Sequence, residues 1–150
     1  MRIAIASDHA ALDLKAELAA WLADHGHEVN DLGPHDSASV DYPDYGRKIA
    51  HAIATGVAER GVALCGSGIG ISIAANRDPA VRCALVNEPL SASLAREHND
   101  ANVIAMGARL LGPEMAKACL TAFLATDFAG GRHQGRVDKL SHLSASSQKV

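Results

Sequence analysis

The chain has 150 residues, 48% of them apolar, a length and composition that fit one globular domain and exclude a disordered protein. Its net charge of −3 provides no basic field for nucleic acid, and an aromatic content of 3% leaves few side chains on which bases could stack. The first apolar run, residues 3–6, is too short for a signal peptide or a membrane span, and the three cysteines are widely spaced. We therefore expect a cytoplasmic protein with reduced thiols that binds neither nucleic acid nor a membrane.

Short apolar runs alternate with longer amphipathic stretches along the chain. The short runs predict five strands, over residues 3–6, 28–32, 62–65, 83–86 and 103–106. The first amphipathic stretch ends at residues 25–27 and has one apolar face, formed by Leu14, Leu18, Trp21 and Leu22. A second helix begins after Tyr42-Pro43 and carries a stripe of Tyr45, Ile49, Ala52, Ile53 and Val57. Further helices are expected over residues 71–76, 89–97 and 113–124.

This order of strands and helices predicts an α/β fold. Strands joined by helices form right-handed βαβ units, so we expect a parallel sheet with helices on both faces, in three layers, α/β/α. Ligands of such sheets bind beyond the carboxyl ends of the strands, which places along one rim residues 7–9, 65–70, 87–88 and 107–109. Because no internal repeat or linker is present, we expect a single domain over residues 1–143 and a frayed tail over residues 144–150.

The helix expected over residues 113–124 is apolar on two sides. One side carries Met115, Cys119, Ala122 and Phe123, and another carries Leu120 and Leu124. A helix with two apolar sides has to be covered on both, so we interpret it as a contact within an oligomer.

The turn at residues 65–70, Cys-Gly-Ser-Gly-Ile-Gly, is the main candidate site. Cys65 ends a buried strand just before a helix N-terminus, where backbone N–H groups and the helix dipole favour an anion and a thiolate. The missing side chains of Gly66, Gly68 and Gly70 let a ligand approach the backbone closely, and Ser67 adds a hydroxyl. The turn therefore offers a base or nucleophile beside an anion hole. The alternative interpretation is a buried core cysteine in a tight turn.

Familiar motifs do not fit this turn. A dinucleotide fingerprint needs Gly-x-Gly-x-x-Gly in the first strand–helix turn, and a P-loop needs Gly-Lys-Ser/Thr. A cysteine phosphatase loop would have an arginine where Ile71 stands, and a redox pair would have a second cysteine where Gly68 stands. Each of these sites lacks a residue that its chemistry requires.

Other polar residues have two interpretations each. Asp8 and His9 follow the first strand and are either site residues or a helix cap with a surface histidine. His98 is either an acid or base, or a histidine favoured by the end of a helix. Arg132 and Arg136 either clamp a phosphate or form a solvated basic patch. Ligand spacing suggests no metal and no other cofactor.

Five motifs occur in order between the first strand and Val137. They are Ser7-Asp8-His9-Ala10-Ala11, Asp41-Tyr42-Pro43, Cys65 to Asn76, Glu97 to Val103 and Gly130 to Val137. Together they resemble ribose-5-phosphate isomerase type B, whose fold the related galactose-6-phosphate isomerase subunits share. The resemblance implies a five-stranded parallel sheet in a Rossmann-like sandwich and a homodimer or tetramer with shared active sites. It also implies metal-free interconversion of ribose 5-phosphate and ribulose 5-phosphate, a step of the pentose phosphate pathway.

The resemblance further implies roles for single residues. Cys65 matches the base that moves a proton between C1 and C2, His98 matches the acid or base that opens the sugar ring, and Ser67 keeps a catalytic hydroxyl. Substrate contacts are implied for Asp8, His9, Gly66, Ser67, Gly68, Ile69, Gly70, Asn99, Arg109, Arg132 and Arg136. One branch of the family uses a glutamate base, and here Ile71 stands at that place, so the chain resembles the cysteine branch.

Three alternatives stay open at the level of sequence. The first is an isomerase of another phosphosugar, such as allose 6-phosphate, galactose 6-phosphate or a tetrulose phosphate, with Asp41, Tyr42 and the surroundings of His9 shaping the choice. The second is a non-catalytic module that binds phosphate or a nucleotide. The third is a cysteine hydrolase, which would form a covalent intermediate.

Overall fold

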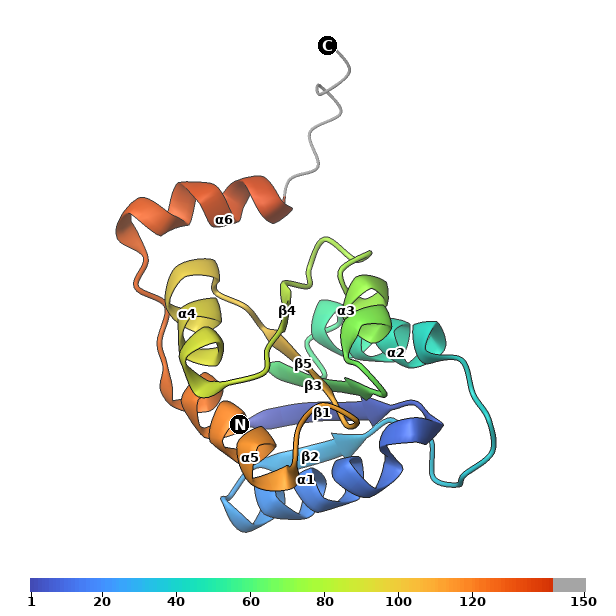
Figure 1. Cartoon of the computed structure of the whole chain (residues 1–150). Helices are drawn as coiled ribbons and strands as arrows, with labels where there is room; N and C mark the ends of the chain where they lie inside the picture. The colour runs from blue at the N-terminus through green and yellow to red at the C-terminus, as the bar shows by residue number, and fades with distance from the viewer. Residues whose placement is uncertain (142–150) are drawn as a thin grey trace.

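Five parallel strands form the central sheet of the structure, a computed structural model that describes residues 1–141 (Figure 1). They are β1 (Arg2–Ser7), β2 (Glu28–Asp31), β3 (Arg60–Cys65), β4 (Cys83–Leu85) and β5 (Val103–Gly107). Their order across the sheet is β2-β1-β3-β5-β4, so β2 and β4 are the edge strands. The predicted five-stranded parallel sheet is confirmed. The tail expected over residues 144–150 lies outside the described residues.

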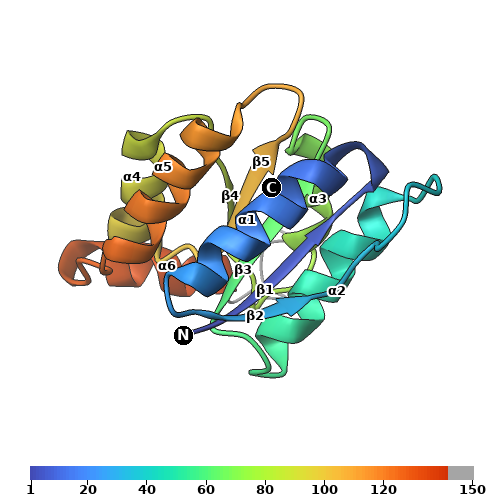
Figure 2. The ribbon, with the colours of Figure 1, turned by 90° about the horizontal axis from the view of Figure 1, so that it is seen from below.

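Helices cover both faces of the sheet, which confirms the three-layer α/β/α fold. One face carries α1 (Leu12–Asp24), α4 (Pro89–Asn99) and α5 (Pro113–Ala125), and the other carries α2 (Tyr42–Ala54) and α3 (Ile69–Ala75) (Figure 2). Two short 3-10 helices, η1 (His9–Ala11) and η2 (Gly131–His133), lead into α1 and α6 (Gln134–Ser141). No helix within residues 1–141 is long and apolar enough to cross a membrane.

The two faces of the sheet carry side chains of different size. On β1, Ile3 and Ile5 belong to the core beneath α1, α4 and α5, whereas Ala4 and Ala6 belong to the core beneath α2 and α3. This division follows from the sequence, because successive side chains of a strand point to opposite faces. The small residues allow α2 to lie close to the sheet, and a Cβ added at Gly61 would come within 2.8 Å of the Ile49 side chain.

Two helices end at positions that differ from the prediction. The helix expected over residues 89–97 continues through His98 to Asn99 and ends at Asp100, which has a left-handed backbone. Val57, expected on the buried stripe of α2, lies beyond the end of that helix and is 52% exposed. This prediction is wrong because the chain turns at Gly56, whose φ is +71°.

Most of the apolar surface of α5 is covered within the chain itself. Ala116, Cys119, Leu120 and Phe123 are buried, and Leu124 packs against the same core. The helix lies on the sheet in contact with both α4 and α1. Neighbouring helices of the same chain therefore account for most of the apolar surface of α5, Met115 stays 42% exposed, and the oligomer contact at this helix stays a prediction.

Candidate active site

The carboxyl ends of β1, β3 and β5 meet at one edge of the sheet. Ser7 pairs with Leu64 and Cys65 pairs with Gly107, so the loops that follow these strands are neighbours. They surround a pocket of about 410 Å³, lined by Asp8, His9, Ala10, Tyr42, Cys65, Gly66, Ser67, Gly70, Arg109 and Leu110. Seven of the fourteen residues predicted on this rim line the pocket.

Cys65 lies at the floor of this pocket. Cys65 is the last residue of β3 and is only 4% exposed. The sulfur accepts a hydrogen bond from the backbone N–H of Gly68, with 3.0 Å between Sγ and N. The turn therefore aims a backbone donor at the sulfur from inside the chain.

Ser67 and Arg109 provide the polar groups beside the thiol. Ser67 Oγ accepts a hydrogen bond from the N–H of Ile69 at 3.3 Å. The loop after β5 is bonded to the turn, because the N–H of Arg109 donates to the carbonyl of Gly66 at 3.0 Å. The exposed guanidinium of Arg109 lies 3.3 Å from the place of a Cβ at Gly66. A cation at the mouth of the pocket suits an anionic group such as phosphate.

Two glycines of the turn make room for neighbouring side chains of the protein, and not for a ligand. A Cβ at Gly70 would lie 2.5 Å from the ring of Tyr42, and one at Gly68 would lie 2.6 Å from the Leu85 side chain. The space that a ligand was expected to use at these two positions is therefore filled by the protein. Gly68 does not line the pocket, and neither does Ile69, whose side chain is 51% exposed. Both were predicted to bind substrate, and this geometry does not support direct contact in a single copy.

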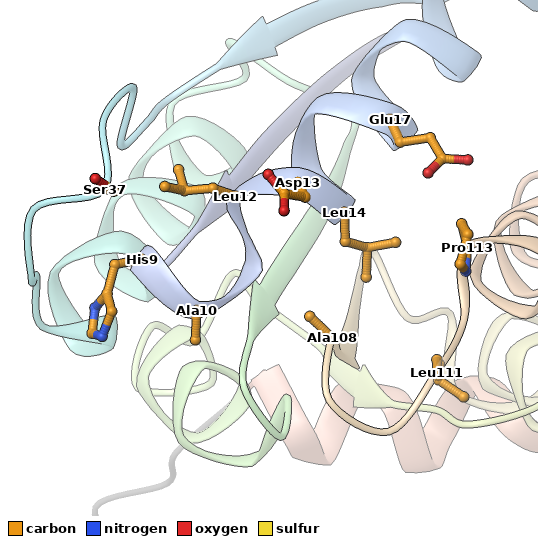
Figure 3. Close-up of a pocket in the computed structure, with 10 residues that line it drawn as sticks. All are labelled: His9, Ala10, Leu12, Asp13, Leu14, Glu17, Ser37, Ala108, Leu111 and Pro113. Atoms are coloured by element: carbon orange, nitrogen blue, oxygen red, sulfur yellow. The ribbon is translucent and has the colours of Figure 1, made fainter.

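Asp8 and His9 combine both of their interpretations. Asp8 Oδ1 accepts a hydrogen bond from Ala10 N at 2.9 Å and so caps η1, yet the residue also lines the pocket. His9 Nδ1 lies 3.2 Å from both the N and the O of Val40. This contact ties the loop between β2 and α2 to the rim. A second hollow of about 440 Å³ adjoins the pocket through His9 and Ala10 (Figure 3).

The remaining predicted residues lie at the other end of the sheet. Asn99 closes α4, just before the amino end of β5, whereas Cys65 pairs with the carboxyl end of that strand at Gly107. It lines a separate pocket of about 400 Å³. Four steps along β5 separate the two ends by about 13 Å. Within one copy of the chain, Cys65 and Asn99 therefore share no pocket.

His98 is joined there by His133, which belongs to the Gly130 to Val137 motif and was considered only together with the two arginines. The rings of His98 and His133 are stacked, with centroids 4.5 Å apart and planes 9° from parallel. Burial, together with the positive charges of His98, Arg132 and Arg136, lowers the pKa of His133. Arg132 Nε lies 3.4 Å from His133 Nε2. The signal for His133 was its place between two candidate arginines.

Arg132 and Arg136 lie on two consecutive helical elements. Arg132 belongs to η2 and Arg136 to α6, and both side chains are exposed. They accompany His98 and His133 at the far end of the sheet. We call His98, Asn99, Arg132 and Arg136 the distal group. Tyr42 lies in the Cys65 pocket and not in the distal group, and from the sequence it was expected only to help choose the sugar. Within residues 1–141, no three His, Cys, Asp or Glu side chains form a group that would hold a metal ion.

The fold and the pocket define a class, namely α/β enzymes that place a cysteine and an arginine at the carboxyl edge of a parallel sheet. The chain belongs to the Ribose/Galactose Isomerase family, which it matches over residues 3–140. It is 44% identical over 142 residues to ribose-5-phosphate isomerase B of Escherichia coli, with 95% of each chain covered. It is 41% identical over 144 residues to D-erythrulose-4-phosphate isomerase of Pectobacterium atrosepticum, covering 95% of this chain and 94% of the relative.

Solved structures show the same similarity. Ribose-5-phosphate isomerase B of Clostridium thermocellum superimposes with a TM-score of 0.93 at 46% identity, over 94% of this chain and 95% of that one. The type B enzyme of Trypanosoma brucei superimposes with a TM-score of 0.90 at 39% identity, over 93% of this chain and 96% of that one. The family resemblance found in the sequence is confirmed, and the chain is an aldose–ketose isomerase.

Proposed function

We propose that this isomerase interconverts D-ribose 5-phosphate and D-ribulose 5-phosphate, with Cys65 as the base. The observation that carries the proposal is the pocket itself, in which the thiol lies beside the hydroxyl of Ser67 and the guanidinium of Arg109. The names of the similar isomerases from Escherichia coli and Clostridium thermocellum support the choice of sugar.

The proposed reaction needs only proton transfers. The thiolate of Cys65 takes the proton from C2 of the open-chain aldose, and the negative charge moves to the oxygen at C1. A proton then passes from the hydroxyl oxygen at C2 to the oxygen at C1, and the same thiol returns its proton to C1, which leaves the carbonyl at C2 and gives the ketose. Ser67 and backbone N–H groups stabilise the enediolate between these steps, at about 3 kcal/mol for each well-aimed donor. Arg109 holds the phosphate, so that binding energy positions the reacting carbons.

The distal group enters this proposal through a second copy of the chain. In a homodimer, or a tetramer built from dimers, His98 of one copy opens the sugar ring at the Cys65 pocket of the other. Asn99 contacts the enediolate there, and Arg132 and Arg136 contact the phosphate. A shared site explains why one copy holds these groups at opposite ends of its sheet.

An exposed apolar surface provides the contact for such a dimer. β4 is an edge strand flanked by α3 and α4 (Figure 1). Large apolar side chains are exposed on all three elements, namely Ile69, Ile73, Leu85, Leu90 and Leu94. Exposed apolar side chains gathered along one edge are typical of an interface, and a two-fold contact would cover them in both copies.

Cys65, Cys83 and Cys119 are all free, which fits the cytoplasmic location that we propose.

A second candidate substrate follows from one relative. The Pectobacterium enzyme is named for a four-carbon sugar phosphate, so the same pocket in this chain is proposed, with lower priority, to accept other phosphosugars. An NMR assay of a phosphosugar panel in D2O separates these cases. Solvent deuterium should enter C1 or C2 of ribose and ribulose 5-phosphate faster than in any other sugar. Faster exchange with another sugar would make that sugar the proposed substrate in place of ribose 5-phosphate. No exchange with any sugar would contradict the proposed activity.

A further inference from the structure

The residue that follows the distal histidine and asparagine has an unusual backbone. Asp100 has φ 45° and ψ 42°, and within residues 1–141 it is the one non-glycine residue with positive φ. A glycine usually takes this left-handed position after a helix, because a Cβ crowds the backbone there. Since Asp100 directly follows His98 and Asn99, its conformation determines how the end of α4 is placed.

Two arginines hold the carboxylate of Asp100. Arg96 Nη1 donates to Oδ1 at 2.8 Å, and Arg82 Nη2 donates to Oδ2 at 2.7 Å. Arg82 Nε also donates to the backbone carbonyl of Asp100 at 2.9 Å. Each carboxylate oxygen thus has a charged donor of its own. Because Arg96 belongs to α4 and Arg82 precedes β4, these bonds attach the end of the helix to the edge of the sheet.

The same cluster reaches the segment that leads to the distal arginines. Arg96 is 4% exposed, and its Nε donates to the carbonyl of Thr126 at 3.3 Å. Close by, Ala129 N donates to the carbonyl of Glu97 at 3.0 Å. Thr126 and Ala129 lie between α5 and η2, so these contacts fix the start of the segment that carries Arg132 and Arg136. One buried arginine therefore links both parts of the distal group.

We propose that Asp100 is a positioning residue whose ion pairs with Arg82 and Arg96 set His98 and Asn99 of the distal group for the active site. The inference rests on the proposed function, in which His98 and Asn99 act on substrate bound at the Cys65 pocket of a second copy. Asp100 acts through its neighbours, because arginines occupy both of its carboxylate oxygens. A small displacement of such groups lowers turnover strongly even when the fold is intact.

Two substitutions separate the carboxylate from the backbone conformation. Asp100→Gly removes both ion pairs and leaves the left-handed backbone without strain, whereas Asp100→Asn keeps the shape and one acceptor but loses the charge. For Asp100→Gly we expect kcat with ribose 5-phosphate to fall about ten- to hundredfold while KM stays within about threefold. The kcat of Asp100→Asn should lie between those of Asp100→Gly and the parent. This pattern is expected because the distal histidine and asparagine act mainly in the transition state.

Asp31→Asn is a matched control. Asp31 also pairs with a buried cation, since Lys15 Nζ lies 2.6 Å from its carboxylate. The side chains of Asp31 and Asp100 are equally exposed, at 33%. Loss of this charge should lower the melting temperature as Asp100→Asn does, with kcat kept at the parental value, because the Lys15–Asp31 pair joins α1 to β2 away from the distal group.

Kinetic constants, melting temperature and dimer mass are compared for the four proteins. Lower kcat at constant KM in both Asp100 variants, with parental kcat in Asp31→Asn, supports the inference. Parental kcat in Asp100→Gly overturns it, and so does a fall in kcat that Asp31→Asn reproduces at the same loss of melting temperature. A parent that turns over no phosphosugar would overturn the proposed function as well, whereas an active parent with an equally active Asp100→Gly variant overturns this inference alone.

Discussion

The Cys65 pocket and the distal group are held in place by different means. In the pocket, backbone hydrogen bonds join the turn to the loop after β5, and the absence of a side chain at Gly107 makes room for the backbone of Ser67. In the distal group, the side chains are held by the ion pairs of Asp100 and by the stacked rings of His98 and His133. The first region should therefore fail when volume is added, and the second when charge is removed.

The difference follows from where the two regions lie in the fold. The pocket is built at the ends of central strands, whose register fixes the loops that follow them. The distal group lies on the end of one helix and on a segment with no strand beneath it, so side-chain contacts fix it together with the backbone bond between Ala129 and Glu97. Substitutions in the two regions should consequently change different measured quantities.

The largest expected effect is that of Cys65→Ala. Removing the base should lower kcat by about 10²- to 10⁴-fold, while the variant still binds substrate. Cys83→Ala is the control, because burial raises the pKa of the Cys83 thiol to about 12 and keeps it protonated at neutral pH. Steady-state kinetics and substrate titration check this prediction. A Cys65→Ala variant with kcat within about tenfold of the parent would rule out Cys65 as the base.

Gly107→Ala tests the volume limit of the pocket. The added Cβ would meet the backbone of Ser67 at 2.6 Å, and backbone atoms cannot rotate away as a side chain can. We expect a loss of about 1–3 kcal/mol in the free energy of unfolding, with lower kcat because the turn shifts. In the control Gly112→Ala, the new Cβ has no neighbour within 4 Å. Urea unfolding of both variants measures the difference, and equal stability would show that the turn is not tightly packed.

Arg136→Ala tests the charge of the distal group. Loss of a charge-assisted contact to phosphate should raise KM about tenfold or more and leave kcat nearly unchanged. The control is Arg47→Ala, which removes an exposed arginine that pairs with Asp44 on α2. The same KM in Arg136→Ala and parent would argue against a phosphate contact at this residue.

The smallest expected effect concerns pH and His133. Because its pKa is lower in the folded state, the unfolded state binds a proton first, and stability is lost as pH falls through the ordinary histidine value of 6.5. His133→Gln should therefore show a smaller drop in melting temperature between about pH 8 and pH 5 than the parent. Part of the drop should persist, since burial also lowers the pKa of His27. An unchanged pH dependence in the variant would contradict a neutral His133.

The sequence predicted the sheet and the pocket well because both follow from short-range patterns. Alternating apolar runs mark the strands, and in a parallel sheet the residues after each strand must meet at one edge, as Asp8, Cys65 and Arg109 do. The stacking of His98 on His133 joins residues 35 positions apart, with β5 and α5 between them, and no periodicity encodes such a contact. Likewise, the sequence showed three glycines in the turn but not that Tyr42 and Leu85 fill the space beside two of them.

The resemblance contributed what composition and periodicity did not, namely partners for the thiol. From the residues alone, His98 and the two arginines had equally good explanations as surface groups. The apolar pattern of α5 did not show that α1 and α4 of the same chain contact this helix, so the pattern alone does not require an oligomer.

Mixing two inactive variants tests most directly whether the Cys65 pocket and the distal group of different copies form one site. Cys65→Ala and His98→Asn should each be nearly inactive alone. After they are unfolded and refolded together in equal amounts, half of the dimers contain both variants, and each of these has one intact site, so activity should return to about a quarter of the parental value. Mass spectrometry of the native dimers verifies that mixed dimers have formed. If mixed dimers are present and activity does not return, the two groups do not combine across copies, and the account of a shared site is wrong.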